Sequence, residues 1–291
     1  MNNSVMKKIL VTGANGQLGK ELRDIASSFP QFEFLFLSRE DMPIHHFELV
    51  RNTFNGFQPD YCINCAAYTA VDKAEQESEM AYIINAESVG ILAAVSREHH
   101  CKFIHISTDY VFSGDSPKPY IETDATGPVS VYGKSKLAGE LEAMKQCPDA
   151  IIIRTSWVYS FYGNNFVKTM MRLMKERNEI SVVSDQIGSP TWAGYLAAFI
   201  MHVINGPSWK SGIYHFSNLG EISWYDFAIE IKRLINSQTI VHPIPTSAYP
   251  TPAKRPAFSL LDKTKIKAAF GYTPPHWKES LKTCIDRLLA Q

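Results

Sequence analysis

The sequence predicts an α/β fold: a doubly wound parallel sheet with a smaller, mainly helical C-terminal lobe. Short apolar runs alternate with helix-like segments through the first half of the chain, and a glycine-rich turn follows the first apolar run. After about residue 156 this alternation weakens. Buried runs separated by helices are typical of a parallel sheet with helices on both faces, where ligands bind at the carboxyl ends of the strands.

Each predicted strand is a short apolar run. In chain order we expect strands at Lys8–Thr12, Glu33–Leu37, Tyr61–Asn64, Lys102–Ser107 and Ala150–Thr155. The segments between them have the length and periodicity of crossover helices. We expect helices at Gln17–Ser27, within Glu75–Glu98 as one long helix or two, and at Val131–Lys145.

In the second half of the chain, proline and glycine are frequent and the regular alternation is lost. Helical stretches remain at Asn165–Arg177, Tyr225–Ile235 and Lys278–Leu289, which we assign to the smaller lobe. The proline-rich segment His242–Pro256 is expected to be a loop on the substrate side.

Composition and charge exclude several classes of protein. The chain has 291 residues, enough for one large domain or two closely packed ones. Lys+Arg and Asp+Glu both number 29, so no net basic field points to nucleic acid or an anionic membrane. No apolar run approaches the roughly 20 residues of a membrane helix, and the N-terminus lacks a secretion signal. We expect a short disordered lead at Met1–Val5 and a cytoplasmic protein.

The cysteines and histidines give no sign of a redox or metal centre. Five scattered cysteines fit reduced thiols in the cytoplasm. Cys62 and Cys65 have a C-x-x-C spacing, but they lie in a buried-strand pattern, so we expect two inert cysteines in the core or at a strand end. The nine histidines show no zinc spacing, and the pairs at 45–46 and 99–100 are expected on the surface.

Gly13, Gly16 and Gly19 form a GxxGxxG motif between the first strand and the first helix. The first glycine permits a tight turn, the second lets backbone amides approach a pyrophosphate, and the third allows close packing of helix on strand. The helix N-terminus adds positive potential. A Walker A loop would end in Gly-Lys-Ser/Thr, which Gly19-Lys20-Glu21 does not match. The motif therefore predicts a dinucleotide site in a Rossmann-type domain.

The end of the second strand indicates which dinucleotide is bound. An acidic residue there would bind a ribose 2′-hydroxyl and favour NAD. Here Ser38 and Arg39 follow the strand, and a guanidinium suits a 2′-phosphate. We therefore predict NADPH. Glu40 and Asp41 lie close enough to serve a ribose, so NADH stays open.

Tyr132 and Lys136 form a Y-x-x-x-K pair on one face of a predicted helix. A nearby ammonium favours the phenolate and so lowers the pKa of a tyrosine, which is otherwise near 10. Tyr132 can then protonate a carbonyl oxygen as hydride arrives on the carbon, while Lys136 binds the nicotinamide ribose. Thr108, at the end of a strand, can position the same oxygen. The sequence thus predicts a carbonyl reductase.

The domain boundaries follow from these motifs. We assign residues 6–156 to an NADP-binding Rossmann domain, to which segments around 180–217 return. Residues 157–291 are expected to form mainly the substrate-binding lobe.

These motifs carry a family resemblance. The chain resembles the extended short-chain dehydrogenase/reductases and, among them, the dTDP-4-dehydrorhamnose reductase family. The matching strings are GANGQLGKEL (13–22), NCAAYTAVDKAE (64–75), STDYVFSG (107–114), VYGKSKLAGE (131–140), RTSWVY (154–159), SDQIGSPTWA (184–193) and RPAFSLLD (255–262). They span nearly the whole chain in the family's order.

The resemblance implies a role for each matching residue. The catalytic set would be Thr108, Tyr132 and Lys136. The dinucleotide would contact Gly13, Gly16, Gln17, Leu18, Ser38, Arg39, Ala66, Ala67, Tyr68, Tyr132 and Lys136, with Asn85 as a buttress. The nucleotide-sugar substrate would contact Val71, Asp109, Tyr110, Trp157, the 184–193 segment and Arg255, whose guanidinium suits a diphosphate. Arg255 can also be interpreted as a structural arginine, and Trp157 can equally be interpreted as a core residue.

The resemblance also leaves alternatives open. The family commonly has Asp-Arg where this chain has Ser38-Arg39. Some members bind magnesium through glutamates at a dimer contact; Glu21 matches one such position, so a magnesium ion and a homodimer stay open. Nucleotide-sugar epimerases and dehydratases share the fold, but dehydratases carry Asp-Glu after the strand-end threonine, where this chain has Asp109-Tyr110. The regulatory β subunit of methionine adenosyltransferase is a non-catalytic relative.

Overall fold

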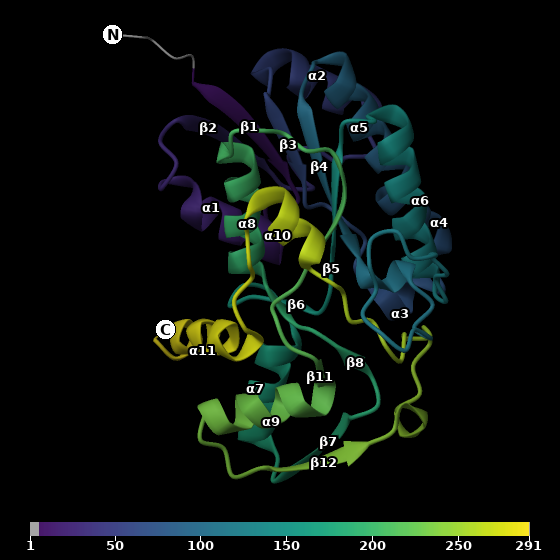
Figure 1. The fold of residues 1–291 in the computed structure, drawn as a ribbon, viewed down its shortest axis with the longest axis vertical. Helices are drawn as coiled ribbons and strands as arrows, with labels where there is room; N and C mark the ends of the chain where they lie inside the picture. Colours follow the sequence, from purple (N-terminus) through teal and green to yellow (C-terminus); the bar gives the residue numbers. More distant parts are fainter. Residues whose placement is uncertain (1–5, 291) are drawn as a thin grey trace.

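The computed structural model describes residues 6–290, where a six-stranded parallel sheet forms one part of the molecule (Figure 1). Its strands are β1 (Lys7–Thr12), β2 (Phe32–Leu37), β3 (Tyr61–Asn64), β4 (Lys102–Thr108), β5 (Ile151–Thr155) and β10 (Gly212–Phe216). The order is β2-β1-β3-β4-β5-β10, and every neighbouring pair is parallel. The predicted doubly wound sheet is confirmed. The lead expected at Met1–Val5 lies outside the described residues.

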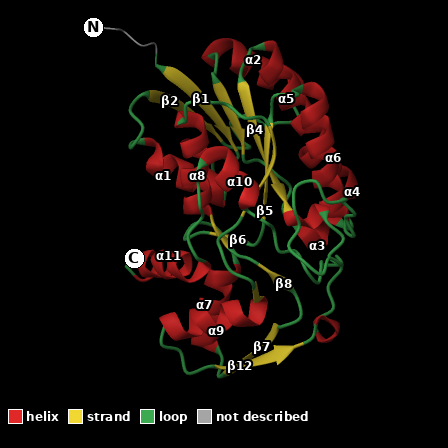
Figure 2. Ribbon diagram, in the orientation of Figure 1, coloured by secondary structure: helices red, strands yellow, loops and turns green. Residues whose placement is uncertain are grey.

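Helices cover both faces of this sheet (Figure 2). One layer contains α1 (Gln17–Ala26) and α8 (Ala193–Asn205); the other contains α2 (Phe47–Phe57), α5 (Ser88–Glu98) and α6 (Val131–Gln146). The alternation along β1 explains the two layers, since successive side chains of a strand point to opposite faces. Ile9 and Val11 pack in the core beside α1 and α8, whereas Leu10 packs in the core beside α2 and α5.

The segment between β3 and β4 contains an irregular helix. It consists of α3 (Val71–Ala74), α4 (Ser78–Tyr82) and a π-helical turn η1 (Ile83–Glu87) that runs into α5. The π turn faces α6, where Gly139 lies so close that a Cβ there would stand 1.9 Å from the Asn85 carbonyl oxygen. The short helix η2 (Asp109–Val111) follows β4.

The second part of the molecule lies beyond the carboxyl ends of the strands (Figure 1). Its helices are α7 (Phe166–Glu176), α9 (Trp224–Leu234) and α11 (Trp277–Leu289). Its short strands pair as β6 (Val158–Tyr159) with β9 (Thr191–Trp192), β8 (Ile187–Gly188) with β11 (Ile222–Ser223), and β7 (Glu179–Val183) with β12 (Ile240–Ile244). A separate apolar core includes Tyr159, Phe227 and Trp277. The remaining helices are η3 (Thr246–Ala248) and α10 (Thr264–Phe270), which packs on β10.

The loop expected at His242–Pro256 is wrong in its first residues, because β12 continues through Ile244. Pro243 has no amide hydrogen to donate, yet β12 belongs to a two-stranded sheet and pairs only with β7. A proline is tolerated on such an edge strand, where one side of the backbone forms no ladder.

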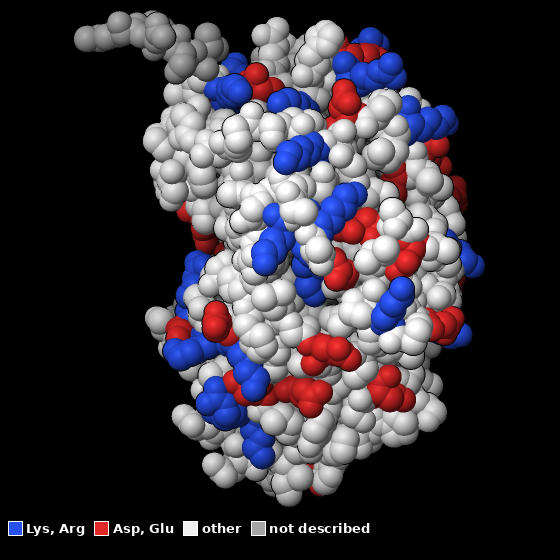
Figure 3. All heavy atoms as spheres, in the orientation of Figure 1, with Lys and Arg blue, Asp and Glu red and all other residues white. Residues whose placement is uncertain are grey.

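The surface and the helix lengths agree with the composition. On the face shown in Figure 3, basic and acidic side chains are interspersed over both parts of the molecule. Within residues 6–290, no helix is both long and apolar enough to cross a membrane.

We expect Gly139→Ala to lower the free energy of unfolding by about 1–3 kcal/mol or more, because its methyl group would collide with the backbone of Asn85. Gly56→Ala in α2 is the control, since nothing lies within 4 Å of its Cβ position. It should stabilise the protein by about 0.5–1 kcal/mol through helix propensity. Urea unfolding of both variants measures the difference. If both variants changed the free energy of unfolding equally, the α6–η1 contact would accommodate the added methyl group without strain.

Candidate active site

The predicted site residues meet at one edge of the sheet. Gly13 follows β1, Ser38 follows β2, Ala66 comes shortly after β3, and Thr108 ends β4. The chain leaves β1 to form β2 on one side and returns to form β3 on the other, so the two crossovers diverge at this point. This is the topological switch point at which open parallel sheets bind ligands.

The glycine loop has the shape that a pyrophosphate requires. Gly13 has φ 66°, and a Cβ there would stand 2.6 Å from the Ala66 amide nitrogen. A Cβ on Gly19 would stand 2.5 Å from the Gly13 carbonyl oxygen. Gly16 is exposed and is the N-cap of α1, so no N-cap side chain occupies the first amides of the helix. The loop therefore fits a dinucleotide phosphate.

The end of β2 is a tight hydrogen-bonded turn. The Ser38 hydroxyl accepts from the amides of Glu40 (3.2 Å) and Asp41 (3.3 Å), and the Ser38 amide donates to the Asp41 carboxylate. These hydrogen bonds hold the pKa of Asp41 below its usual value. Arg39 is exposed and forms no salt bridge with any residue in the range 6–290. Arg39 is thus the side chain best placed to receive an anion here.

The segment after β3 is held by two buried asparagines. The Ala66 amide donates to Asn64 Oδ1 (3.2 Å) and the Tyr68 amide to Asn85 Oδ1 (2.8 Å). Asn85 Nδ2 donates in turn to the Tyr68 carbonyl oxygen (3.1 Å) and to Ser135 Oγ on α6 (3.0 Å). The π turn places Asn85 here, fully buried, and so fixes the backbone of residues 66–68.

Thr108 and Tyr132 lie together. Thr108 Oγ1 accepts from the Tyr110 amide (3.2 Å) and donates to Asp109 Oδ1 (3.0 Å). Burial raises the pKa of Tyr132 to about 12, and a hydrogen bond with Thr108 opposes the rise. The Tyr110 ring packs edge-on against Tyr132 at 5.7 Å. Asp109 is buried, which raises its pKa to about 6.

Lys136 is buried beside β4, although its predicted role is to bind a nicotinamide ribose. Its Nζ donates to the Ile106 carbonyl oxygen (2.7 Å) and lies 3.2 Å from His105 Nε2. Burial lowers the pKa of Lys136 to about 8, which Glu140 opposes. Thr108, rather than Lys136, is the neighbour that lowers the pKa of Tyr132 against the effect of burial.

The predicted substrate residues come from both parts of the molecule. Trp157 adopts φ 47° after β5 and stacks on Trp224 of α9 at 3.7 Å. A Cβ on Gly188 would stand 2.9 Å from the Trp157 ring, so the 184–193 segment lies against it. Trp157 is only half-buried, so part of its side chain remains exposed.

Arg255 is already partnered. Its guanidinium forms a bidentate ion pair with Asp72 of α3 (3.1 and 2.8 Å). It also bonds Thr251 and the Ala253 carbonyl oxygen within its own loop. Arg255 thus holds this loop beside Val71, at the start of α3. These contacts are those expected of a structural arginine.

Sequence reasoning missed several residues that hold the site. Trp224 and Asp72 contact predicted residues that are distant in sequence, and no local pattern signals such a pair. His105 had a usable signal, because it is a polar residue in the middle of an apolar strand and such residues are buried only with partners. Cys62 lies in the core, and Cys65 is half-buried just after β3; both are free thiols whose pKa is raised by burial.

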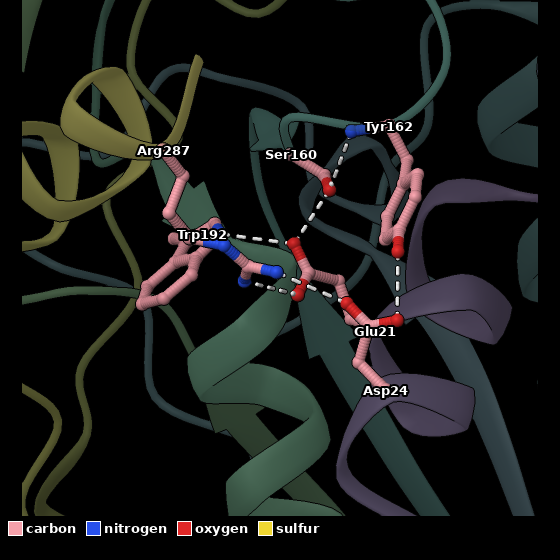
Figure 4. Close-up of polar contacts among 6 residues, drawn as sticks. All are labelled: Glu21, Asp24, Ser160, Tyr162, Trp192 and Arg287. Atoms are coloured by element: carbon pink, nitrogen blue, oxygen red, sulfur yellow. Dashed lines mark hydrogen bonds and ion pairs between the residues drawn. The ribbon is translucent and has the colours of Figure 1, made fainter. Parts of the chain in front are cut away.

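Glu21 lies in a cluster that joins α1 to the second part of the molecule (Figure 4). Its Oε1 accepts from Ser160 Oγ (2.6 Å) and Trp192 Nε1 (3.0 Å). Arg287 of α11 lies 3.5 Å from Glu21 Oε2 and 3.1 Å from Asp24. Burial raises the pKa of Glu21, although these partners oppose the rise.

This cluster does not fit a magnesium ion. Mg²⁺ requires several oxygen ligands and open positions for water. Both Glu21 oxygens already have partners, and the Arg287 guanidinium beside them would repel a second cation. Among the described residues, no group of three or more His, Cys, Asp or Glu side chains is arranged to hold a metal.

A glycine loop after β1, together with Thr108, Tyr132 and Lys136 at the carboxyl edge of a parallel sheet, defines an oxidoreductase of the short-chain dehydrogenase/reductase type. Comparisons with known proteins narrow this class. The family described as RmlD substrate binding domain matches residues 6–290. A dTDP-4-dehydrorhamnose reductase of Aggregatibacter actinomycetemcomitans is 44% identical over 287 residues, covering 95% of this chain and 98% of the relative.

Solved structures agree. A dTDP-4-dehydrorhamnose reductase from Clostridium acetobutylicum superposes with a TM-score of 0.94 at 42% identity, covering 97% of this chain and 99% of that one. The enzyme of that name from Bacillus anthracis, solved in complex with NADP, gives 0.94 at 39% identity, covering 97% of this chain and 100% of that one. The chain therefore belongs to the dTDP-4-dehydrorhamnose reductase family.

We expect Arg287→Gln to lower the free energy of unfolding at pH 8 by about 1 kcal/mol, because it leaves the buried Glu21 carboxylate without a counter-charge. Burial raises the folded-state pKa of Glu21, so the ionised carboxylate lowers the free energy of unfolding at pH values above that pKa. This destabilisation disappears as the pH falls toward 4.5, because the carboxyl group is then protonated in the folded protein. The loss should therefore shrink at pH 5. Arg172→Gln, which removes an exposed pair with Glu176, is the control and should change little at either pH. A pH-independent loss would contradict this account.

Proposed function

We propose that the protein reduces the C4 keto group of dTDP-4-dehydro-L-rhamnose to give dTDP-L-rhamnose, with NADPH as the reductant. The observation that carries the proposal is the Thr108–Tyr132–Lys136 set in a chain that dTDP-4-dehydrorhamnose reductases match over nearly its whole length. The dinucleotide would lie against residues 6–156, and the nucleotide sugar mainly against the lobe that begins at residue 157. NADPH, when bound, supplies the hydride.

Tyr132 would act as the proton donor. Its phenol is protonated at neutral pH, because burial raises its pKa to about 12. Such a group donates a strong hydrogen bond to a carbonyl oxygen as negative charge develops there. Thr108 lies beside the phenol and holds the same oxygen in line, while its own hydroxyl is oriented by the Tyr110 amide.

Trp157 and Asp109 would shape the sugar side of the pocket. The stacked pair of Trp157 and Trp224 presents a flat apolar surface, which suits a deoxysugar ring or a nucleoside base. Asp109 is buried next to Thr108, and its Oδ2 has no partner among residues 6–290. A sugar hydroxyl would supply the missing hydrogen-bond donor.

Tyr132→Phe should lower kcat by roughly 10²–10⁴-fold and leave the Kd for NADPH nearly unchanged, because only the proton donor is removed. The measurement is loss of the reduced-nicotinamide absorbance with enzymatically made dTDP-4-dehydro-L-rhamnose, together with NADPH titration of the free protein. Near-native turnover would disprove the assignment of the acid. No NADPH oxidation by the unaltered protein would overturn the proposed function and favour an epimerase or dehydratase with retained NAD, or a binding subunit.

Arg39→Ala should raise the KM for NADPH by roughly tenfold and leave the KM for NADH unchanged, because a charge-assisted hydrogen bond to the 2′-phosphate contributes about 1.5–3 kcal/mol at most sites. Arg51→Ala on α2 serves as the control, since Arg51 is an exposed arginine paired with Glu98. If both cofactors weakened equally, Arg39 would not be reading the 2′-phosphate.

A further inference from the structure

A row of buried polar side chains runs beneath the dinucleotide loop to Lys136. Thr12, Asn64 and His105 are direct neighbours across β1, β3 and β4. None of them is more than 1% exposed. The row ends at Lys136 Nζ, 3.2 Å from His105 Nε2. The proposed reduction uses Lys136 but assigns nothing to His105.

The direction of every hydrogen bond in this row follows from one backbone amide. The Ala66 N–H can only donate, and it donates to Asn64 Oδ1, which also accepts from Thr12 Oγ1 (2.6 Å). Asn64 Nδ2 therefore faces His105, and it donates to Nδ1 at 3.0 Å. A neutral imidazole with Nδ1 as acceptor carries its proton on Nε2. His105 thus points an N–H at Lys136.

An ammonium cannot accept that hydrogen. A protonated lysine has three donors and no acceptor, whereas the neutral amine has a lone pair. In the observed position the amine donates to the Ile106 carbonyl oxygen and accepts from His105 Nε2. Reversing the Asn64 amide to suit an ammonium would set its NH₂ group against the Ala66 N–H instead. The charged form therefore always faces one donor–donor contact in this pose.

The other charged groups around Lys136 do not remove this conflict. Glu140 faces Lys136 from one turn along α6, but it is held by Arg154 of β5 (2.7 Å) and by Ser107. Asp109 and Tyr132 lie on the Thr108 side. On the elements that pack against α6 from outside, the charged residues Lys73, Glu79, Glu87, Arg97 and Glu98 are exposed, and Asp72 is paired with Arg255.

We propose that His105 is a positioning residue that favours the neutral amine of Lys136, and that at alkaline pH NADPH binding draws Lys136 away from His105 with uptake of a proton from solvent. The inference rests on the proposed function, since the ribose hydroxyls of a bound dinucleotide are the groups that would draw the lysine. The step is balanced: the amine and a hydronium ion give the ammonium and water. Cofactor binding would then charge the group that Tyr132 needs beside it. Burial, which lowers the pKa of Lys136 to about 8, acts in the same direction.

The test is calorimetric titration of the protein with NADPH in buffers of different ionisation enthalpy, which counts the protons taken up without any turnover. At pH 8.5 we expect roughly three quarters of a proton per NADPH, because a group with a pKa of about 8 is mostly neutral there. At pH 6.5 the uptake by this group should be near zero. The 2′-phosphate, with a second pKa of about 6, does not contribute at pH 8.5.

Matched variants assign the proton. Lys136→Met should abolish the uptake at pH 8.5. Lys263→Met should keep it, although burial lowers the pKa of Lys263 to about 8 as well. His105→Gln should reduce the uptake severalfold, since a glutamine amide can turn its oxygen toward an ammonium. His215→Gln, at another fully buried histidine bonded to the Tyr120 carbonyl oxygen, should leave it unchanged.

Each outcome decides between the two proposals. NADPH binding without proton uptake at pH 8.5 overturns the role of His105 and leaves the proposed reductase intact. Unchanged uptake in Lys136→Met or His105→Gln also overturns it. If NADPH does not bind at all, the proposed function fails and this inference fails with it. Should His105→Gln not fold, the unaltered protein and Lys136→Met at the two pH values still decide.

Discussion

The close approach of the two backbone segments that follow β1 and β3 is the constraint on which the rest of the site depends. A side chain at Gly13 would collide with the Ala66 amide, so the dinucleotide loop and the segment after β3 have one relative position. The same Ala66 amide bonds Asn64, and Asn64 orients His105. The glycine loop, the segment after β3 and, through Asn64 and His105, the surroundings of Lys136 are thus linked by one contact between main chains. Buried polar groups this well satisfied are costly to disturb and favour a single arrangement.

Helix α1 also holds the second part of the molecule in place relative to the sheet. The helix that begins at the glycine loop also holds the second part: Gln17 accepts from Asn165 Nδ2 (3.0 Å), and Glu21 accepts from Ser160. Both partners follow Trp157 in the chain. The helix whose N-terminus would face the pyrophosphate therefore also positions the aromatic surface proposed for the sugar. Arg287 neutralises Glu21 with a covalently held cation, so this junction is complete without a metal.

The sheet and most crossover helices were predictable, because each apolar run and each glycine acts within a few residues of itself. The second half was less so. Helix α8 is apolar nearly all round, since it packs on the sheet beside α1 and contacts Phe270 of α10 through Phe199. Such a segment has no periodic polar face. Strand β12 was hidden by Pro243, which only an edge position permits. At the site, residue types predicted the chemistry, but the partners of Arg255 and Trp157 arise from contacts across the fold.

The pair Tyr132 and Lys136 shows why a motif and its mechanism are separate inferences. The i, i+4 spacing places both on one face of α6, as the sequence indicates. The energetics then diverge, because burial raises the pKa of the phenol to about 12 and lowers that of the amine to about 8. The phenol is therefore neutral at neutral pH, whereas the amine is mostly charged there and becomes mostly neutral only above about pH 8. Above that pH a neutral amine cannot stabilise a phenolate. The lysine would then regain its charge only through an event that the fold alone does not provide, and binding of a dinucleotide beside it is the event that we propose.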